Sequence, residues 1–164
     1  MLFRSTLKLP EEERKLTNRA QFLDDLAMSM GGYAAEKIAF GDVTTGPSND
    51  IQVATRIARS MVTKWGMSEE IGPIALEGSE GKALFGQGMQ PHQLSEAQEA
   101  RIDTAVSDIL NTAKDRAIEA LTTNRAVLDA LVAELLKKEL LEQDEYNALL
   151  AKHGIVIKKK KEDA

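Results

Sequence analysis

The sequence predicts a mainly α fold, a helical bundle with a small β element. Apolar residues recur at three- and four-residue spacing over several segments, which is the pattern of helices with one buried face. Aromatic residues make up only 4% of the 164 residues, so Leu, Ala, Ile, Val and Met supply the apolar content. That composition favours packed helices over a sheet sandwich. Glycine and proline separate the periodic segments, as expected for turns.

Length and charge narrow the function classes. A chain of 164 residues suits one domain that buries a real core. Its net charge of -5 argues against a general nucleic-acid surface. The absence of cysteine excludes disulfides and thiolate metal ligands, and it fits a reducing cytoplasm. No apolar run reaches membrane-spanning length and no signal-peptide profile is present, so this fragment is expected to be soluble.

The first part of the chain predicts a strand and an interrupted helix. Residues 2–9 alternate apolar and polar side chains up to Pro10, which indicates a short strand or, equally, a frayed terminus. Thr17 or Asn18 is expected to cap the first helix. Gly31 and Gly32 interrupt it, so either the helix bends there or another backbone comes close.

A second helix is predicted to begin at Pro47 or Ser48, after the loop that starts at Gly41. Its apolar stripe comprises Ala54, Ile57, Ala58, Met61 and Trp65. Asp50 stands four residues before Ala54 on the same stripe. A carboxylate at the head of a buried face is costly unless something pairs with it.

Three explanations compete for Asp50. A first-turn acid faces the positive end of the helix dipole and accepts from free N–H groups. A carboxylate that points into a pocket can bind zinc. A buried ion pair with Arg56 or Arg59 is the third explanation, and the helical wheel places it poorly.

Other polar residues near Asp50 have a structural and a functional interpretation. Glu36, within the Ala-rich segment, is either a solvated acid near Lys37 or an outer-shell residue that orients metal ligands. The neighbouring loop residues, by default caps, can also hold the Asp50 rotamer. They are Thr44, Thr45, Ser48 and Asn49.

The C-terminal half predicts a helical hairpin and a short last helix. Ser95 and Gln98 form a capping-box pattern that opens the longest helix, up to about Leu121. The following helix, through Val127 and Leu136, is expected to pack antiparallel to it because the turn is short. Residues 143–152 predict the last helix, and residues 74–76 and 83–85 a possible hairpin. We assign residues 1–155 to one domain and 156–164 to a disordered charged tail.

Several motifs together resemble a known family. They are LPEEE at residues 9–13, MGGYAAEKIAFGDVTTGPSNDI at 30–51 and ATRIARSMVTKWGMSEEIGPIAL at 54–76. In order and spacing they resemble the peptidase domain of FtsH, a membrane-anchored ATP-dependent zinc metalloprotease, over about residues 7–149. The resemblance therefore implies a helical-bundle metallopeptidase domain.

The resemblance also implies a role for Asp50. In that family two histidines of an HExxH and a downstream aspartate in T-G-x-x-N-D-I hold the zinc, and Thr45 to Ile51 match this segment. Asp50 is then the third zinc ligand, with Glu36, Thr45 and Asn49 as possible outer-shell residues. Neither His92 nor His153 lies in an HExxH. The chain is therefore expected to begin downstream of that motif, to hold no catalytic residue and to be inactive alone.

For the complete enzyme, the resemblance implies a homo-hexamer on the cytoplasmic face of a membrane, attached through segments outside this chain. A separate module would use ATP to deliver unfolded protein substrates, in the service of protein quality control, and no nucleic acid is expected as a partner. The alternative is a non-catalytic helical oligomerisation or scaffold module derived from the same fold. His92, in a loop beside Pro91, is expected to be a surface residue, and His153, near a helix end, is expected to interact with the helix dipole.

Overall fold

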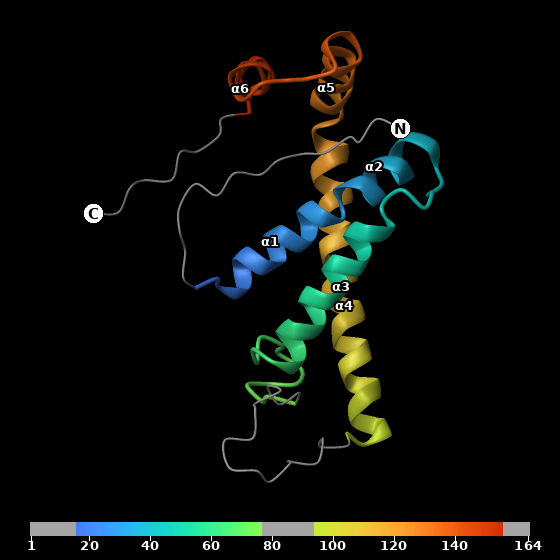
Figure 1. Ribbon diagram of the computed structural model, residues 1–164, viewed down its shortest axis with the longest axis vertical. Coiled ribbons are helices and arrows are strands. Elements are labelled where there is room, and N and C mark those ends of the chain that lie inside the picture. The colour runs from blue at the N-terminus through green and yellow to red at the C-terminus, as the bar shows by residue number, and fades with distance from the viewer. Residues whose placement is uncertain (1–15, 77–93, 156–164) are drawn as a thin grey trace, which may run out of the picture.

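The computed structural model describes residues 16–76 and 94–155, and its described residues are mainly helical (Figure 1). The helices are α1 (Arg19–Ser29), α2 (Gly31–Phe40), α3 (Ser48–Thr63), α4 (Glu96–Thr123), α5 (Arg125–Lys138) and α6 (Gln143–Lys152). The mainly α prediction is confirmed. The predicted strand at 2–9, the strand at 83–85, His92 and the predicted tail at 156–164 lie outside the described residues.

Helix α4 is the element on which the other helices of the main core pack. Helices α1, α2 and α3 all contact it, and α1 also contacts α3 (Figure 1). The fully buried side chains at these contacts include Leu26 of α1, Ala34 of α2, Met61 of α3 and Ile102 of α4. Small side chains at several buried positions allow the helices to approach closely.

The first two helices follow one another with a bend at Met30. Asn18, one of the two expected caps, forms a full capping box with Gln21: each backbone N–H donates to the other residue's side-chain oxygen at 2.9 Å. The Met30 N–H donates to Leu26 and its carbonyl accepts from Ala34, so hydrogen bonding continues across the bend. Of the two alternatives predicted from Gly31 and Gly32, the structure shows the bend, which lies at Met30.

Helix α3 begins at Ser48, as predicted, and its buried stripe is also confirmed. Ala54, Ala58 and Met61 are fully buried against the neighbouring helices. Trp65 departs from the prediction: the helix ends at Thr63, and the indole lies beyond it with 46% of its surface exposed. Its ring stacks on Phe22 of α1 with the centroids 4.6 Å apart.

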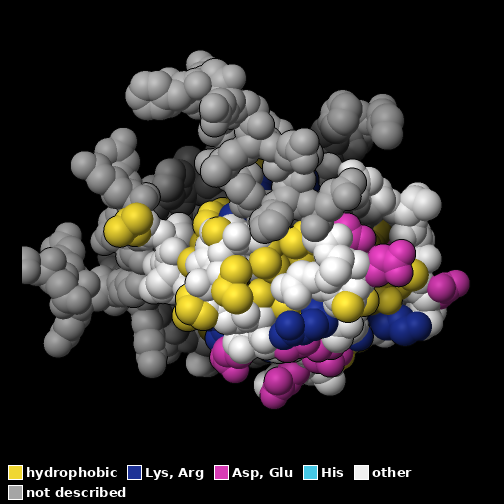
Figure 2. Space-filling model, turned by 90° about the horizontal axis from the view of Figure 1, so that it is seen from below, with side chains coloured by type: hydrophobic (Ala, Val, Ile, Leu, Met, Phe, Trp, Pro, Cys, Tyr) yellow, Lys and Arg dark blue, Asp and Glu magenta, His cyan; other side chains and the backbone are white. Residues whose placement is uncertain are grey.

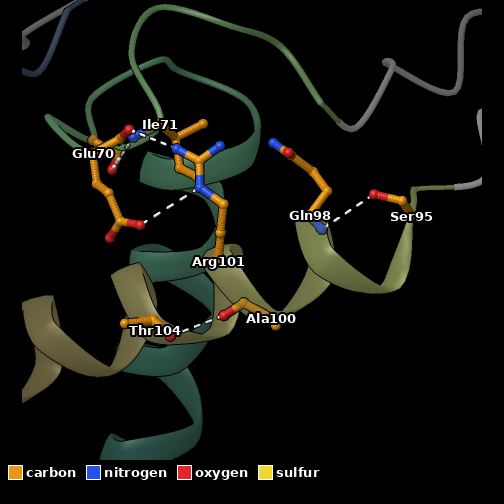
Figure 3. Close-up of polar contacts among 8 residues, drawn as sticks. Glu70, Ile71, Ser95, Gln98, Ala100, Arg101 and Thr104 are labelled. Carbon is orange, nitrogen blue, oxygen red and sulfur yellow. Dashed lines mark hydrogen bonds and ion pairs between the residues drawn. The ribbon is translucent and has the colours of Figure 1, made fainter.

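After α3 the chain turns back and is held by arginines from two helices. Arg19 of α1 donates from Nε to the carbonyl of Met67 at 2.9 Å. Arg101 of α4 donates to the carbonyl of Glu70 at 3.0 Å, and its Nε lies 3.7 Å from the Glu70 carboxylate (Figure 3). Figure 2 views the molecule from this end and shows acidic and basic side chains side by side along an apolar surface. The two arginines therefore fix the turn to the core.

The strand predicted at residues 74–76, as the first half of a possible hairpin, is wrong. Residues 74–76 form no strand, and the N–H groups of Ile74 and Leu76 have other partners. Ile74 donates to the carbonyl of Gly72, and Leu76 donates at 2.8 Å to the carbonyl of Thr63 at the end of α3. The free carbonyls of a helix C-terminus thus replace a partner strand.

Two glycines of this turn provide a matched pair for a stability prediction. Gly66 and Gly72 both have positive φ, +59° and +81°. A Cβ at Gly66 would stand 2.9 Å from the Cα of Pro73, whereas nothing lies within 4 Å of one at Gly72. We expect Gly72→Ala to cost about 1–2 kcal/mol for the left-handed conformation. Gly66→Ala should cost at least about 1 kcal/mol more, because the backbone must shift.

Urea denaturation, followed by the fluorescence of the single tryptophan Trp65, measures the free energy of unfolding of both glycine variants. Equal losses of unfolding free energy for the two variants would contradict the close approach at Gly66.

Helix α5 does not pack antiparallel along α4, and that prediction is wrong. Only Asn124 separates the two helices, and α5 continues beyond the end of α4 in Figure 1. Asn124 donates to the carbonyl of Ala120 from both its backbone and its side chain, and it accepts from the N–H groups of Val127 and Leu128. With helical hydrogen bonding nearly continuous, one residue cannot reverse the chain direction.

Helix α6 covers part of α5, and its bounds agree with the predicted residues 143–152. Lys138 Nζ and Glu145 Oε1 lie 2.6 Å apart across the connection. This hydrogen bond and ion pair raise the pKa of Lys138 and lower the pKa of Glu145. Within the described parts of the chain, no helix is both long and apolar enough to cross a membrane.

Candidate metal-ligand site at the start of helix α3

The loop between α2 and α3 runs back over one face of α2. Gly41 ends α2 in the left-handed conformation (φ 72°), which turns the chain round. Glu36 and Gly32 are four residues apart and therefore share a face of α2. Thr44 bonds to Glu36, and a Cβ on Gly32 would stand 3.8 Å from the Cβ of Pro47. The loop thus passes both positions before α3 starts.

The carboxylate of Glu36, which is half-buried, is the hydrogen-bond acceptor at the centre of this loop. Its Oε2 accepts from the backbone N–H of Thr44 at 2.7 Å, and its Oε1 accepts from the Thr44 hydroxyl at 2.9 Å. The Thr44 hydroxyl oxygen in turn accepts from the N–H of Gly46 at 3.0 Å. Hydrogen bonds to a charged acceptor are among the stronger ones in proteins.

The first turn of α3 is set by backbone contacts. Its N-cap position is the buried Pro47, which offers no side-chain acceptor. Ser48 donates from its N–H to the carbonyl of Thr45 at 3.2 Å, and Ile51 donates to the carbonyl of Pro47 at 3.0 Å. Asp50 lies in this first turn, where the helix dipole favours a negative charge.

Asp50 itself is exposed, one turn before the fully buried Ala54. The desolvation cost expected for a carboxylate at the head of a buried face therefore does not arise in this structure. Arg59 directs its guanidinium to α4, where Nη1 lies 3.4 Å from Asp103 Oδ1, so an Arg59 ion pair does not account for Asp50. The helix-dipole role fits an exposed first-turn acid, whereas the metal-ligand role requires further ligands that the described residues do not supply.

The three predicted outer-shell residues make different contacts in the structure. Glu36 bonds to Thr44, while Thr45 contributes its backbone carbonyl to the start of α3, and Asn49 is exposed in the first turn. Across the described ranges 16–76 and 94–155, no group of three or more His, Cys, Asp or Glu could hold a metal ion. His153, at the C-terminal end of α6, is exposed and distant in sequence from this site.

Thr44 is one of four loop residues that the sequence indicates as caps, but the sequence does not predict its hydrogen bonds to Glu36. Its hydroxyl and N–H make the bonds that connect the loop to α2. The sequence offered one signal, two threonines directly before a glycine, which is typical of side-chain hydrogen bonds to a turn backbone. That signal does not show which distant carboxylate the threonine meets.

Similarity to known proteins identifies the family of this chain. The profile of Peptidase family M41 matches residues 4–149. The ATP-dependent zinc metalloprotease FtsH of Thermotoga maritima is 43% identical over 147 residues, which are 89% of this chain and 24% of the relative. The protein of the same name from Rubrobacter xylanophilus is 37% identical over 152 residues, 92% of this chain and 23% of the relative.

A third relative, ATP-dependent zinc metalloprotease FtsH 4 of Synechocystis, is 39% identical over 147 residues, 88% of this chain and 23% of the relative. These matches and the helical fold define the class of protein, which is a metalloprotease peptidase domain. The chain belongs to Peptidase family M41. It spans about a quarter of the length of the curated relatives it matches.

Proposed function

We propose that this chain is most of the proteolytic domain of an ATP-dependent zinc metalloendopeptidase and that Asp50 supplies the third protein ligand of its zinc. The observation that carries the proposal is the position of Asp50. It lies in the exposed first turn of α3, within the segment Thr45 to Ile51 that matches the family motif. A carboxylate there is accessible, and its negative charge is stabilised by the helix dipole.

The donor chemistry at this position fits zinc. Carboxylate oxygen is a common zinc ligand, and Asp50 offers one such donor in a rigid helical turn. The bound metal would polarise the scissile carbonyl and activate water. The two histidine ligands and the general base of an HExxH do not occur in these 164 residues, so the chain alone is proposed to be inactive.

Around Asp50, we assign Glu36 the role of an outer-shell residue, with Thr45 and Asn49 as further members. Glu36 supports this role because its carboxylate bonds to the loop that leads into α3, at 2.7 and 2.9 Å. Thr45 supports it through the carbonyl that accepts from the Ser48 N–H. Residues that hold a ligand in place tune the affinity of a metal site without touching the metal.

The remaining features of the proposal concern the complete protein. By analogy with the FtsH relatives, we propose an ATP-using module, assembly into a homo-hexamer, attachment to a membrane through other segments, and unfolded membrane and soluble proteins as substrates. Membership of Peptidase family M41 does not favour the alternative of a non-catalytic scaffold module.

Two purified proteins test the proposal: this 164-residue chain and the protein expressed from the complete reading frame that contains it. Zinc content and ATP-dependent casein hydrolysis are measured for both. We expect about one zinc per subunit and casein hydrolysis for the second protein, and neither for the first. A complete protein that retains no zinc would overturn the proposed function. Stoichiometric zinc and peptidase activity in the isolated chain would overturn its proposed inactivity.

A further inference from the structure

The Thr44 side chain joins two parts of the site. Its hydroxyl donates to Glu36 Oε1 on α2 at 2.9 Å and accepts from the Gly46 N–H in the loop at 3.0 Å. The backbone N–H of the same residue donates to Glu36 Oε2 at 2.7 Å. Thr44 therefore donates hydrogen bonds to both carboxylate oxygens of Glu36, and these bonds hold the loop at Thr44 against α2.

From Thr44 to Asp50 the chain has little freedom. A Cβ at Gly46 would stand 3.1 Å from Glu36 Oε1 and 3.2 Å from Thr44 Oγ1, so the loop closes tightly at a residue without a side chain. Pro47 follows with its φ restricted by the ring and its side chain buried. The Ile51 N–H then bonds to the Pro47 carbonyl, which places Asp50 inside the first helical turn.

We propose that Thr44 is a positioning residue for Asp50: its hydroxyl, held between Glu36 and Gly46, sets where the first turn of α3 begins relative to α2. This inference rests on the proposed zinc-ligand role of Asp50. A metal site tolerates displacements of only a fraction of an ångström, so supporting hydrogen bonds affect affinity even though they do not touch the metal. The hydroxyl is the essential group, because the backbone N–H bond to Glu36 survives any side-chain change.

Three variants of the protein from the complete reading frame test the hydroxyl. Thr44→Val removes it and keeps the branched shape, and Thr44→Ser retains it. Thr112→Val removes an exposed hydroxyl of α4 that donates to the backbone carbonyl of Asp108 at 2.8 Å. Zinc binding is measured by competition with a chelator. We expect Thr44→Val to bind zinc about 10-fold more weakly, and Thr44→Ser and Thr112→Val to stay within about twofold of the parent protein.

A second measurement needs no zinc. Hydrogen exchange of the Gly46 and Ile51 amides should be roughly 3- to 10-fold faster in Thr44→Val, with the Ala58 amide unchanged. Unchanged exchange at Ile51, or zinc binding in Thr44→Val equal to that of the parent, would overturn the positioning role. If the parent protein binds no zinc, the proposed function fails, and the exchange rate at Ile51 alone decides whether Thr44 positions the turn.

Discussion

Replacing Asp50 by alanine in the protein expressed from the complete reading frame is expected to abolish zinc retention and casein hydrolysis together. Because Asp50 is the proposed third zinc ligand, its loss should weaken zinc binding by more than the roughly 10- to 100-fold typical of an outer-shell residue. Helical content should remain, because Asp50 is exposed and the buried stripe from Ala54 to Met61 is untouched. Metal analysis after dialysis and far-UV circular dichroism measure the two effects separately.

The matched control is Asp144→Ala. Asp144 is also an exposed acid in a first helical turn, that of α6, so its removal costs the same helix-dipole interaction of about 0.3–1 kcal/mol. We expect this variant to keep its zinc and its activity. If Asp50→Ala behaves like Asp144→Ala, the carboxylate of Asp50 is a helix-end stabiliser and not a ligand.

The second large effect concerns the core. Leu26→Ala should lower the free energy of unfolding by about 2–5 kcal/mol, because Leu26 is fully buried where α1 meets the other core helices. The fluorescence of Trp65 provides the measurement during urea denaturation. Its ring stacks on Phe22, four residues before Leu26 in α1, so it reports on the same packing unit.

Leu136→Ala is the control for this substitution. It removes the same atoms from a side chain of α5 that is 74% exposed, and a change within about 0.5 kcal/mol is expected. A loss of similar size in the two variants would contradict the placement of Leu26 at the centre of the packing unit.

Helical periodicity predicted much of this fold because residues close together in the sequence determine which face of a helix is buried. The stripe of α3, the N-cap Ser95 of α4 and the bounds of α6 all follow from spacing and capping residues within one element. The structure confirms them, except that Trp65 lies beyond the end of α3. In the capping box expected at Ser95, the structure shows the bond from the Gln98 N–H to the Ser95 hydroxyl at 3.3 Å.

What the sequence could not predict depends on contacts between elements. The bond between Thr44 and Glu36 joins a loop residue to a helix residue eight positions earlier, and no periodic pattern records it. The direction of α5 depends on whether Asn124 breaks helical hydrogen bonding, and it largely does not. The proposed ligand role of Asp50 came from the resemblance to a family, since first-turn acids are common in helices of every function.

Helix α4 has a mechanical consequence for the whole domain. Its 28 residues make a rod of about 42 Å. Helices α1 to α3 pack against one stretch of this rod, and α5 and α6 lie beyond its C-terminal end (Figure 1). A small change in the angle at Asn124 would swing the terminal pair through a wide arc and leave the buried side chains around Leu26 where they are. Evolution can therefore re-aim that pair without rebuilding the part of the molecule that presents Asp50.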